Sequence, residues 1–298
     1  MLSIIEEDKK METKIIDAIE MCEFNKETYK KDVMNIEKVI RRKPQFVIIN
    51  ASDDEGNKRY IKNKIKEGEA VGLDVRVMEF DESCTDYDIL YVIELCNENK
   101  IPVILQLPIY NHLNKELLLD RIEPDVDADG FTREWLGEIN LCHDDNIVPA
   151  TPKGVMNLLD YHNVELKGKV ALVIGKSNHV GRPIATLLMN RDATVLVANK
   201  ETTDLPSLVR MADIIVSCVG KLDLINPEDL KEGVVLIGVG FTYVNGRQIL
   251  DFDIDKVVET GKASLVSNRI NCTGKATVNA LIGNVVNLYK MNFGLDVL

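Results

Sequence analysis

The sequence predicts an α/β fold in two domains, and three observations support this prediction. The chain has 298 residues, more than one hydrophobic core usually organises, so two domains are expected. Short apolar runs alternate with stretches of helical periodicity, a pattern typical of parallel strands joined by crossover helices. The apolar runs of the second half are continuous, as expected for strands buried on both faces of a sheet. We therefore expect an N-terminal α/β domain and a Rossmann-like, doubly wound second domain.

The first half of the chain alternates between helix and strand. Apolar positions recur at helical spacing from residue 12 onward, and the apolar run QFVIIN that follows ends in a turn-forming cluster. The predicted helices lie at 12–42, 58–71, about 86–97 and 114–122, and the predicted strands lie at 45–50, 74–80 and 102–107.

A second series begins after the segment PATPKG at 149–154, which is predicted to end one element and to cap the next. The predicted strands lie at 170–175, 193–198, 213–220 and 234–240, and the predicted helices lie at 181–190, 205–211 and 276–290. This change of series places a domain boundary near residue 150. From periodicity alone, the last helix can close either domain.

Composition argues against several protein classes. The chain has 36 Lys and Arg against 48 Asp and Glu, a net charge of −12, which argues against nucleic-acid or membrane-surface partners. No apolar run approaches the ~20 residues that span a bilayer, and acidic residues interrupt the N-terminal segment, so we predict a cytoplasmic protein. Six scattered cysteines and four histidines lack metal-binding spacing, so we expect no metal site. A small-molecule partner is favoured.

The turn GKSNHVGRP at 175–183 follows a predicted buried strand and opens a helix. Gly175 and Gly181 permit close backbone approach, and Pro183 suits an early helical position. A helix N-terminus of this kind can hold a pyrophosphate. The spacing is not G-x-G-x-x-G, so a plain tight connection is the alternative.

The identity of the nucleotide is suggested by charge. An NAD-binding unit usually carries an acidic residue at the end of its second strand, where this chain has Lys200. Lys200 can meet a 2′-phosphate together with Lys176 and Arg182, which favours NADP, while the neighbouring Glu201 keeps NAD possible. Further along, VGK at 219–221 and GVG at 238–240 end later strands at the same predicted edge of the sheet.

A lysine lies on the apolar face of the predicted helix 58–71. A turn of about 100° per residue places Lys64 in the arc that contains Ile61 and Gly68. The alternatives are a side chain whose stem covers apolar surface and an ammonium group that meets a ligand. Tyr60 lies one turn earlier on this face. Gln106 closes an apolar strand at its carboxyl end, where open α/β sheets bind ligands, although it can also be a plain loop residue.

The acidic segment DVDADGF at 125–131 begins like an EF-hand loop. Position twelve, counted from Asp125, is Leu136, which cannot supply the bidentate carboxylate that closes a calcium shell. We therefore favour a ligand-recognising carboxylate at Asp129, which can accept two hydrogen bonds from an amidine-like pair of N–H groups. A solvated acidic loop is the alternative.

These segments, in this order, resemble the bifunctional methylenetetrahydrofolate dehydrogenase/methenyltetrahydrofolate cyclohydrolase family, the FolD family of one-carbon metabolism. The matching segments are YIKNK (60–64), QLP (106–108), DVDADGF (125–131), TPKGV (151–155), GKSNHVGRP (175–183), ADIIVSCVG (212–220) and GVVLIGVG (233–240). The resemblance implies a multifunctional oxidoreductase and hydrolase, usually a homodimer. It also implies a folate-binding catalytic domain at 1–149, joined by the terminal segment 276–298, and an NAD(P)-binding domain at 150–275.

The resemblance also implies residue roles. Lys64 is the cyclohydrolase lysine, Gln106 assists it, Tyr60 packs on the folate ring system and Asp129 holds the pterin amino edge. Gly274 and Thr277 remain from the folate loop. The implied cofactor-binding residues are Gly175, Lys176, Ser177, Gly181, Arg182, Pro183, Lys200, Val219, Gly220 and Gly240.

The chain departs from the family at the folate loop. The family sequence PGGVGPMT is replaced within NRINCTGKATV at 268–278, where Arg269 and Lys275 add positive charge. The altered loop is expected either to bind a different anionic tail or to have lost its role. The sequence thus leaves four possibilities: a bifunctional folate enzyme, a dehydrogenase-only homologue, a non-catalytic folate- or nucleotide-binding protein, and a shikimate-type dehydrogenase on the same architecture.

Overall fold

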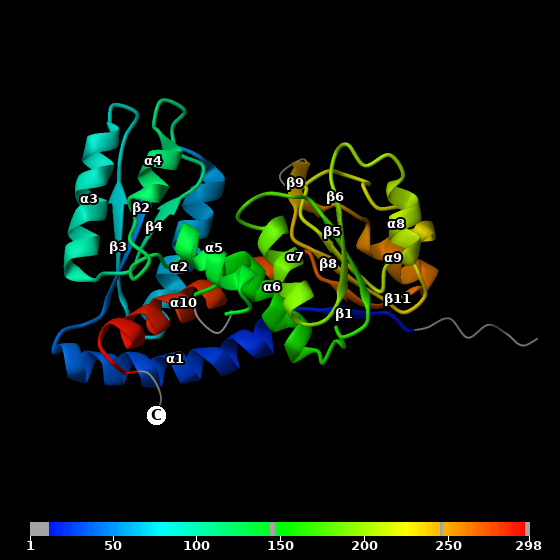
Figure 1. The fold of residues 1–298 in the computed structure, drawn as a ribbon, viewed down its shortest axis with the longest axis horizontal. Helices are drawn as coiled ribbons and strands as arrows, with labels where there is room; N and C mark the ends of the chain where they lie inside the picture. Colours follow the sequence, from blue (N-terminus) through cyan, green and yellow to red (C-terminus); the bar gives the residue numbers. More distant parts are fainter. Residues whose placement is uncertain (1–11, 144–146, 245–246, 296–298) are drawn as a thin grey trace, which may run out of the picture. The chain divides into compact units, whose positions relative to one another are not determined.

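The computed structural model describes residues 12–143, 147–244 and 247–295 (Figure 1). Contacts divide the chain into two compact units. Ile19–His162 and Lys275–Leu298 form one, which we name the three-strand unit, and Met1–Ala18 and Asn163–Gly274 form the other, the six-strand unit. Among the residues that the structure describes, no helix combines the length and apolar character needed to cross a membrane.

The three-strand unit is built on a parallel sheet with strand order β3-β2-β4. Its strands are β2 (Gln45–Asn50), β3 (Asp74–Glu79) and β4 (Val103–Gln106). Its helices are α1 (Ile19–Ile40), α2 (Glu55–Ala70), α3 (Asp86–Asn99), α4 (Lys115–Asp120), α5 (Arg133–Asn140), α6 (Ala150–Tyr161) and α10 (Thr273–Asn292), the last of which begins at the end of the other unit.

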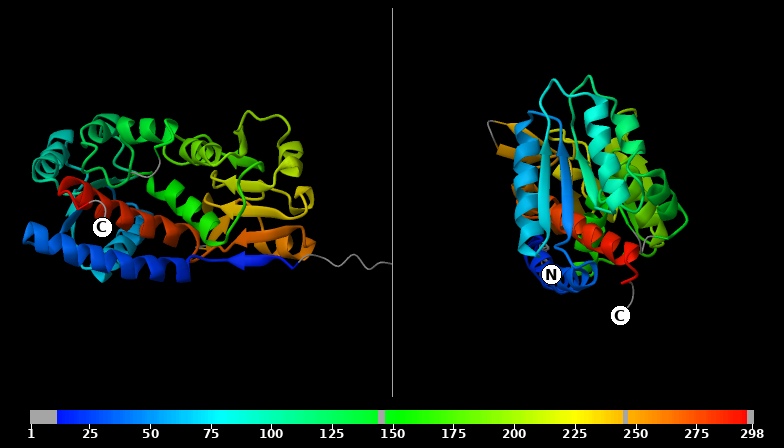
Figure 2. Two further views of the ribbon diagram at one scale, coloured as in Figure 1. Left: turned by 60° about the horizontal axis from the view of Figure 1, so that its bottom comes forward. Right: turned by 90° about the vertical axis from the view of Figure 1, so that its left-hand side faces the viewer.

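Alternate residues of the central strand serve two separate cores. Phe46 and Ile48 of β2 pack with apolar residues of α1, α2 and α10, whereas Val47 and Ile49 pack with apolar residues of α3 and α4. Helix α2 lies on one side of the sheet and α3 on the other (Figure 2). A parallel strand covered on both faces needs apolar residues at successive positions, which is why QFVIIN reads as a continuous apolar run.

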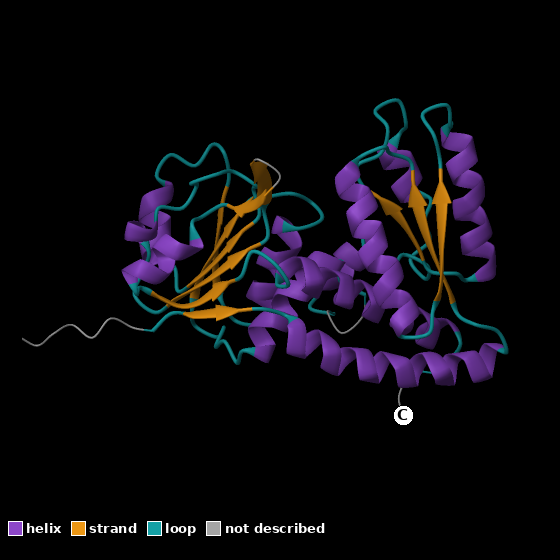
Figure 3. Cartoon of the chain, turned by 180° about the vertical axis from the view of Figure 1, so that it is seen from behind, coloured by secondary structure: helices purple, strands orange, loops and turns teal. Residues whose placement is uncertain are grey.

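The six-strand unit contains a parallel sheet with strand order β1-β11-β8-β7-β5-β6 (Figure 3). Its strands are β1 (Lys14–Ile16), β5 (Val170–Ile174), β6 (Thr194–Ala198), β7 (Ile214–Ser217), β8 (Val234–Gly238) and β11 (Ala263–Ser267). Its helices are α7 (Gly181–Asn190), α8 (Leu205–Met211), the 3₁₀ helix η1 (Pro227–Asp229) and α9 (Ile254–Thr260), and β9 (Phe241–Val244) pairs with β10 (Arg247–Leu250) in a separate antiparallel hairpin. The predicted two-domain α/β fold is confirmed.

Several elements differ from the sequence prediction. Residues 14–16, placed in a helix by periodicity, form β1 and pair with β11, and helix α1 begins only at Ile19. A three-residue strand is too short to show a period, so its pairing is invisible in the sequence. The sequence also does not predict helices α5, α6 and α9, the 3₁₀ helix η1, strand β11 or the β9–β10 hairpin.

Helix α6 belongs by its contacts to the three-strand unit, whereas the sequence places a boundary near residue 150. The helix approaches α10 closely at Gly154, where an added Cβ would lie 2.8 Å from the carbonyl carbon of Ala276. The glycine of the TPKGV segment therefore permits a close contact between two helices.

Candidate active site

Helix α2 presents the lysine identified in the sequence to the interior. Asp54 caps the helix by accepting a hydrogen bond from the Asn57 N–H at 2.9 Å. One face buries Ile61, Lys64 and Gly68 as predicted, and Lys64 is only 7% exposed. An added Cβ at Gly68 would lie 2.6 Å from a methyl of Val75, so the glycine allows the helix to lie close to the sheet.

The buried ammonium of Lys64 has a defined partner at the end of β4. Its Nζ donates to Oε1 of Gln106 at 2.8 Å. The amide nitrogen of Gln106 donates to the Leu107 carbonyl at 3.0 Å and to Oδ1 of Asn57 at 3.3 Å, and Asn57 in turn donates to the Pro108 carbonyl at 2.9 Å. Because the Leu107 carbonyl can only accept, the NH₂ group of Gln106 faces it and the amide oxygen faces Lys64.

Asn57 is a site residue that sequence reasoning missed. It is 3% exposed and lies two helical turns before Lys64 on the same face. The sequence predicts a helix that begins at residue 58, which places Asn57 in the preceding turn. An asparagine at this helical spacing from a buried lysine is the signal that identifies it.

The three aspartates of the acidic loop have different partners. Asp125 forms an ion pair with Lys100, Asp127 accepts hydrogen bonds from the Gly130 and Thr132 N–H groups at 2.9 and 2.7 Å, and Asp129 interacts electrostatically with Lys64. They do not converge on one point, and no group of three or more His, Cys, Asp or Glu within the described residues could hold a metal ion.

The environment of these groups favours their neutral forms. Burial lowers the pKa of Lys64, and the nearby carboxylate of Asp129 opposes this shift. Burial likewise raises the pKa of Asp129, opposed by Lys64. Burial also raises the pKa of Asp127 to about 7, although the hydrogen bonds that its carboxylate accepts from two backbone N–H groups oppose this rise. Groups with shifted pKa values that lie together, drawn from separate segments, are typical of catalytic sites.

The remaining predicted folate-site residues lie on α2 and α10. Tyr60 is half-buried on α2, and Gly274 is exposed at the beginning of α10. The hydroxyl of Thr277 donates to that of Thr151 on α6 at 3.3 Å. The added cation Lys275 lies 3.9 Å from a carboxylate oxygen of Glu67, so its charge is balanced by neighbouring acidic groups rather than left open to an anion.

The predicted nucleotide turn connects β5 to α7 through closely packed backbone. Gly175 has φ +116°, and an added Cβ at Gly181 would lie 2.0 Å from the Gly175 carbonyl oxygen. Ser177 accepts a hydrogen bond from the Gly181 N–H at 3.3 Å, and Arg182 donates to the Lys176 carbonyl at 3.3 Å. Only glycine fits at both turn positions, and the exposed Lys176, Ser177 and Arg182 surround the N-terminus of α7 while Pro183 is buried.

Two further glycine turns follow the neighbouring strands. An added Cβ at Gly220 would lie 2.7 Å from the Phe241 carbonyl oxygen, and one at Gly240 would lie 2.3 Å from the Gly220 nitrogen. The fully buried carboxylate of Asp251 accepts hydrogen bonds from the Ser217 hydroxyl and from the Val219 N–H, the latter at 3.1 Å. Asp251 was not identified from the sequence, and it holds the turn after β7.

Lys200 lies directly after β6 and is exposed, with its Nζ 3.6 Å from a carboxylate oxygen of Glu201. Glycine turns follow the carboxyl ends of β5, β7 and β8, and an added Cβ at Gly181, Gly220 or Gly240 would lie too close to neighbouring backbone atoms. The cation Lys200 follows β6. This arrangement fits a dinucleotide, with backbone available to the pyrophosphate and positive charge available to a 2′-phosphate.

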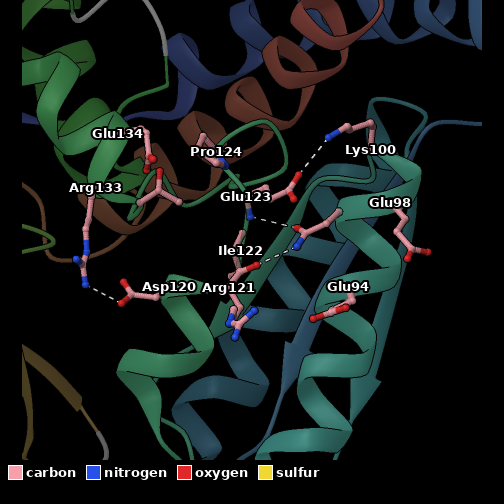
Figure 4. Close-up of a pocket in the computed structure, with 12 residues that line it drawn as sticks. Glu94, Glu98, Lys100, Asp120, Arg121, Ile122, Glu123, Pro124, Arg133 and Glu134 are labelled. Atoms are coloured by element: carbon pink, nitrogen blue, oxygen red, sulfur yellow. Dashed lines mark hydrogen bonds and ion pairs between the residues drawn. The ribbon is translucent and has the colours of Figure 1, made fainter.

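A polar crevice of about 800 Å³ lies elsewhere in the three-strand unit (Figure 4). Its walls carry ion pairs, including Arg133 with Asp120 at 2.7 Å and Lys100 with Glu123 at 3.2 Å. None of the predicted site residues lines it, and we assign it no role.

Comparison with known proteins identifies the family. The model described as tetrahydrofolate dehydrogenase/cyclohydrolase, catalytic domain, matches residues 16–129, and the model for the NAD(P)-binding domain of the same family matches residues 149–293. The chain belongs to this family.

Individual relatives agree with this assignment. The bifunctional protein FolD of Lactobacillus acidophilus is 36% identical over 255 residues, which is 85% of this chain and 89% of that protein. The structure of FolD from Campylobacter jejuni superposes with a TM-score of 0.89 at 31% identity and covers 94% of this chain and 99% of that one. The Trypanosoma brucei enzyme, solved with NADP cofactor and an inhibitor, has a TM-score of 0.88 at 29% identity and covers 94% and 98%.

These matches confirm the resemblance drawn from the motifs, including the NAD(P)-binding domain. They select the folate family over a shikimate-type dehydrogenase. They also extend across the altered segment 268–278, which lies inside the second match.

Proposed function

We propose that this chain oxidises 5,10-methylenetetrahydrofolate to 5,10-methenyltetrahydrofolate with transfer of hydride to NADP, and hydrolyses that product to 10-formyltetrahydrofolate. In this proposal the three-strand unit is the folate-binding catalytic domain and the six-strand unit binds NADP. The main support is the buried Lys64, which donates a hydrogen bond to Gln106 and interacts electrostatically with Asp129. In addition, the two halves of the chain match the two domain models of the family.

The oxidation step asks mainly for positioning. NADP supplies the hydride acceptor, and the folate nitrogens stabilise the cation that forms, so no strong base is needed. Asp129 fits the role of orienting the substrate, because a carboxylate can accept two hydrogen bonds from the amino edge of a pterin. Tyr60, one turn before Lys64 on α2, supplies a ring for the folate to pack against.

The hydrolysis step needs a group that moves a proton. Water adds to the methenyl carbon and loses one proton. The bond from that carbon to a ring nitrogen then breaks as the nitrogen takes up a proton, while the new hydroxyl loses its own proton to solvent and becomes the formyl carbonyl, so each turnover releases one proton. The neutral amine of Lys64 accepts the first proton and returns one to the nitrogen, and burial favours this neutral form by lowering the lysine pKa. Gln106 directs the Lys64 Nζ by accepting its hydrogen bond.

NADP binding is assigned to the glycine turns of the six-strand unit. The turn from Gly175 to Gly181 offers the N-terminus of α7 to the pyrophosphate, flanked by Lys176, Ser177 and Arg182. Lys200 at the end of β6 is placed for the 2′-phosphate, with Glu201 beside it. Val219, Gly220 and Gly240 form the turns after β7 and β8.

The test is the initial rate of nicotinamide reduction when the purified chain receives 5,10-methylenetetrahydrofolate with NADP or with NAD. We expect reduction of both cofactors, with NADP the faster. No reduction of either, together with a folate-induced rise in melting temperature, would make the chain a non-catalytic binding protein and end the proposal.

We also propose that the chain forms a homodimer through α3 and the outer edge of β3. Strand β3 pairs on one side only within the described sheet, and Tyr87, Tyr91 and Leu95 of α3 are 83%, 67% and 40% exposed along one helical face. Sedimentation velocity should give a dimer that Tyr91→Asp dissociates, and a monomer of the unsubstituted chain would contradict this. The cytoplasmic location stays a prediction from the sequence.

A further inference from the structure

A single asparagine of α10 joins three separate segments of the three-strand unit. Asn284 is fully buried. Its amide nitrogen donates to the carbonyl of Ala128 at 3.0 Å and to the carbonyl of Val148 at 2.8 Å, and its amide oxygen accepts from the Nζ of Lys153 on α6 at 2.9 Å. These bonds use both amide hydrogens and the carbonyl oxygen of the side chain, so Asn284 is fully committed to these contacts.

Of the three groups that Asn284 contacts, the Ala128 carbonyl is the nearest in sequence to Asp129, because Ala128 directly precedes Asp129. The same loop is held on its other side by β4, where the Val103 N–H donates to the Val126 carbonyl at 2.8 Å and the Ala128 N–H donates to the Val103 carbonyl at 3.2 Å. The backbone of Ala128 is thus fixed between β4, which also carries Gln106, and α10.

Close packing leaves the loop little freedom to relax if one attachment is lost. Gly130 has φ +71°, and an added Cβ there would lie 2.9 Å from the Pro149 nitrogen. The Asn284 amide donates a hydrogen bond to the carbonyl of Val148, the residue directly before Pro149. The asparagine therefore connects the two backbone segments at the point where they touch.

The partners of Asn284 together determine which way its amide faces. A lysine ammonium can only donate, so the Asn284 oxygen faces Lys153 and its NH₂ group faces the two carbonyls. Burial lowers the pKa of Lys153 to about 8. No role in the proposed reaction was assigned to either residue from the sequence.

We propose that Asn284 is a positioning residue for folate, which sets the Asp129 carboxylate opposite Lys64 by holding the Ala128 carbonyl, and that Lys153 supports it by fixing its amide. This inference rests on the proposed function, since Asp129 is the group taken to recognise the pterin. It assigns substrate affinity to a residue on the helix that begins within the altered segment 268–278.

The same helix offers a matched control. Asn279 is also buried on α10, its amide nitrogen donates to the Cys22 carbonyl at 3.3 Å, and its oxygen accepts from the amide of Asn25 at 2.8 Å. Like Asn284, it is an asparagine that donates to a backbone carbonyl and accepts from a side chain, but it makes one donation rather than two and its partners lie on α1 rather than on the acidic loop.

The experiment compares Asn284→Asp with Asn279→Asp in the full-length chain. Aspartate keeps the size of the side chain and can still accept from Lys153, but it cannot donate to the two carbonyls. The KM for 5,10-methylenetetrahydrofolate should rise about tenfold in Asn284→Asp, the cost expected for unpaired buried acceptors. The KM for NADP should stay unchanged, and Asn279→Asp should leave both KM values near those of the unsubstituted chain.

A second variant keeps the proposal testable if Asn284→Asp does not fold. Lys153→Met removes a charge that burial disfavours and leaves the Asn284 donors in place, so it should fold and should raise the folate KM by about threefold. Equal rises in the KM values for folate and NADP, or a folate KM within twofold of the unsubstituted chain in every variant that folds, would overturn the proposal. Lack of turnover by the unsubstituted chain would instead contradict the proposed function.

Discussion

The candidate sites of the two units differ in whether backbone or side chains form them. In the six-strand unit the site consists of backbone: glycine turns follow β5, β7 and β8, and an added methyl group at Gly181 or Gly240 would lie within 2.3 Å of a neighbouring backbone atom. In the three-strand unit the candidate site consists of side chains from three segments: Lys64 of α2, Gln106 of β4 and Asp129 of a loop.

This difference follows from what each site must do. A pyrophosphate is held well by backbone N–H groups at a helix N-terminus, which any sequence with enough glycine can supply. Proton transfer requires an ionisable side chain with a shifted pKa, which only burial and particular neighbours can produce. The two sites should therefore fail in opposite ways, the first when an atom is added and the second when a functional group is removed.

The largest expected effect is the loss of hydrolysis in Lys64→Met. Removing the Lys64 amine should slow hydrolysis of 5,10-methenyltetrahydrofolate by about 1000-fold, within the range attributed to general acid–base groups. Hydride transfer needs no such group and should retain most of its rate. Lys62→Met, on the exposed face of the same helix, is the control, and equal losses of both activities in Lys64→Met would make Lys64 a binding residue only.

The next largest effect is expected for Gly181→Ala. The added Cβ would lie 2.0 Å from the Gly175 carbonyl oxygen, so the turn must open, and we expect the KM for NADP to rise by about 100-fold, or ~2.7 kcal/mol. Hydrolysis of 5,10-methenyltetrahydrofolate without cofactor should be unaffected. Gly137→Ala, where nothing lies within 4 Å of the new atom, should change neither, and an unchanged NADP KM in Gly181→Ala would remove the turn from the site.

A smaller effect with a distinctive sign is expected for Asp129→Asn. The Asp129 carboxylate raises the pKa of Lys64 against the effect of burial, so its removal should lower that pKa. Hydrolysis requires the neutral amine and rises with pH through this pKa, so the rising limb of the pH–rate profile should move to lower pH. The folate KM should rise about tenfold through the lost hydrogen bonds. A limb that moves to higher pH would contradict the interaction between the two groups.

The sequence predicted the residues whose type is unusual for their position. Lys64 was identified because a lysine on an apolar helical face is costly, and the turn at 175–183 because its glycines are contiguous with a strand and a helix. In the acidic loop the aspartates have separate partners, and the recognition of a ligand by Asp129 stays a prediction.

The supporting residues could not be predicted in the same way. Asn57, Asp251 and Asn284 are of types common in turns and at surfaces, and their burial depends on segments distant in the sequence. Asn284, for example, bonds to the carbonyl of Ala128 across 156 positions, and Asp251 bonds to Ser217 across 34. Only the packing of α10 and the order of the parallel strands bring these pairs together.

The proposed function requires one chain to carry both activities, and following both products in one reaction tests this requirement. The unsubstituted chain would receive 5,10-methylenetetrahydrofolate and NADP, and NADPH and 10-formyltetrahydrofolate would be quantified over time. We expect 10-formyltetrahydrofolate to accumulate in step with NADPH and faster than spontaneous hydrolysis allows. The opposite result is accumulation of NADPH together with 5,10-methenyltetrahydrofolate that is hydrolysed no faster than without the protein. This result would show a chain with dehydrogenase activity but no cyclohydrolase activity.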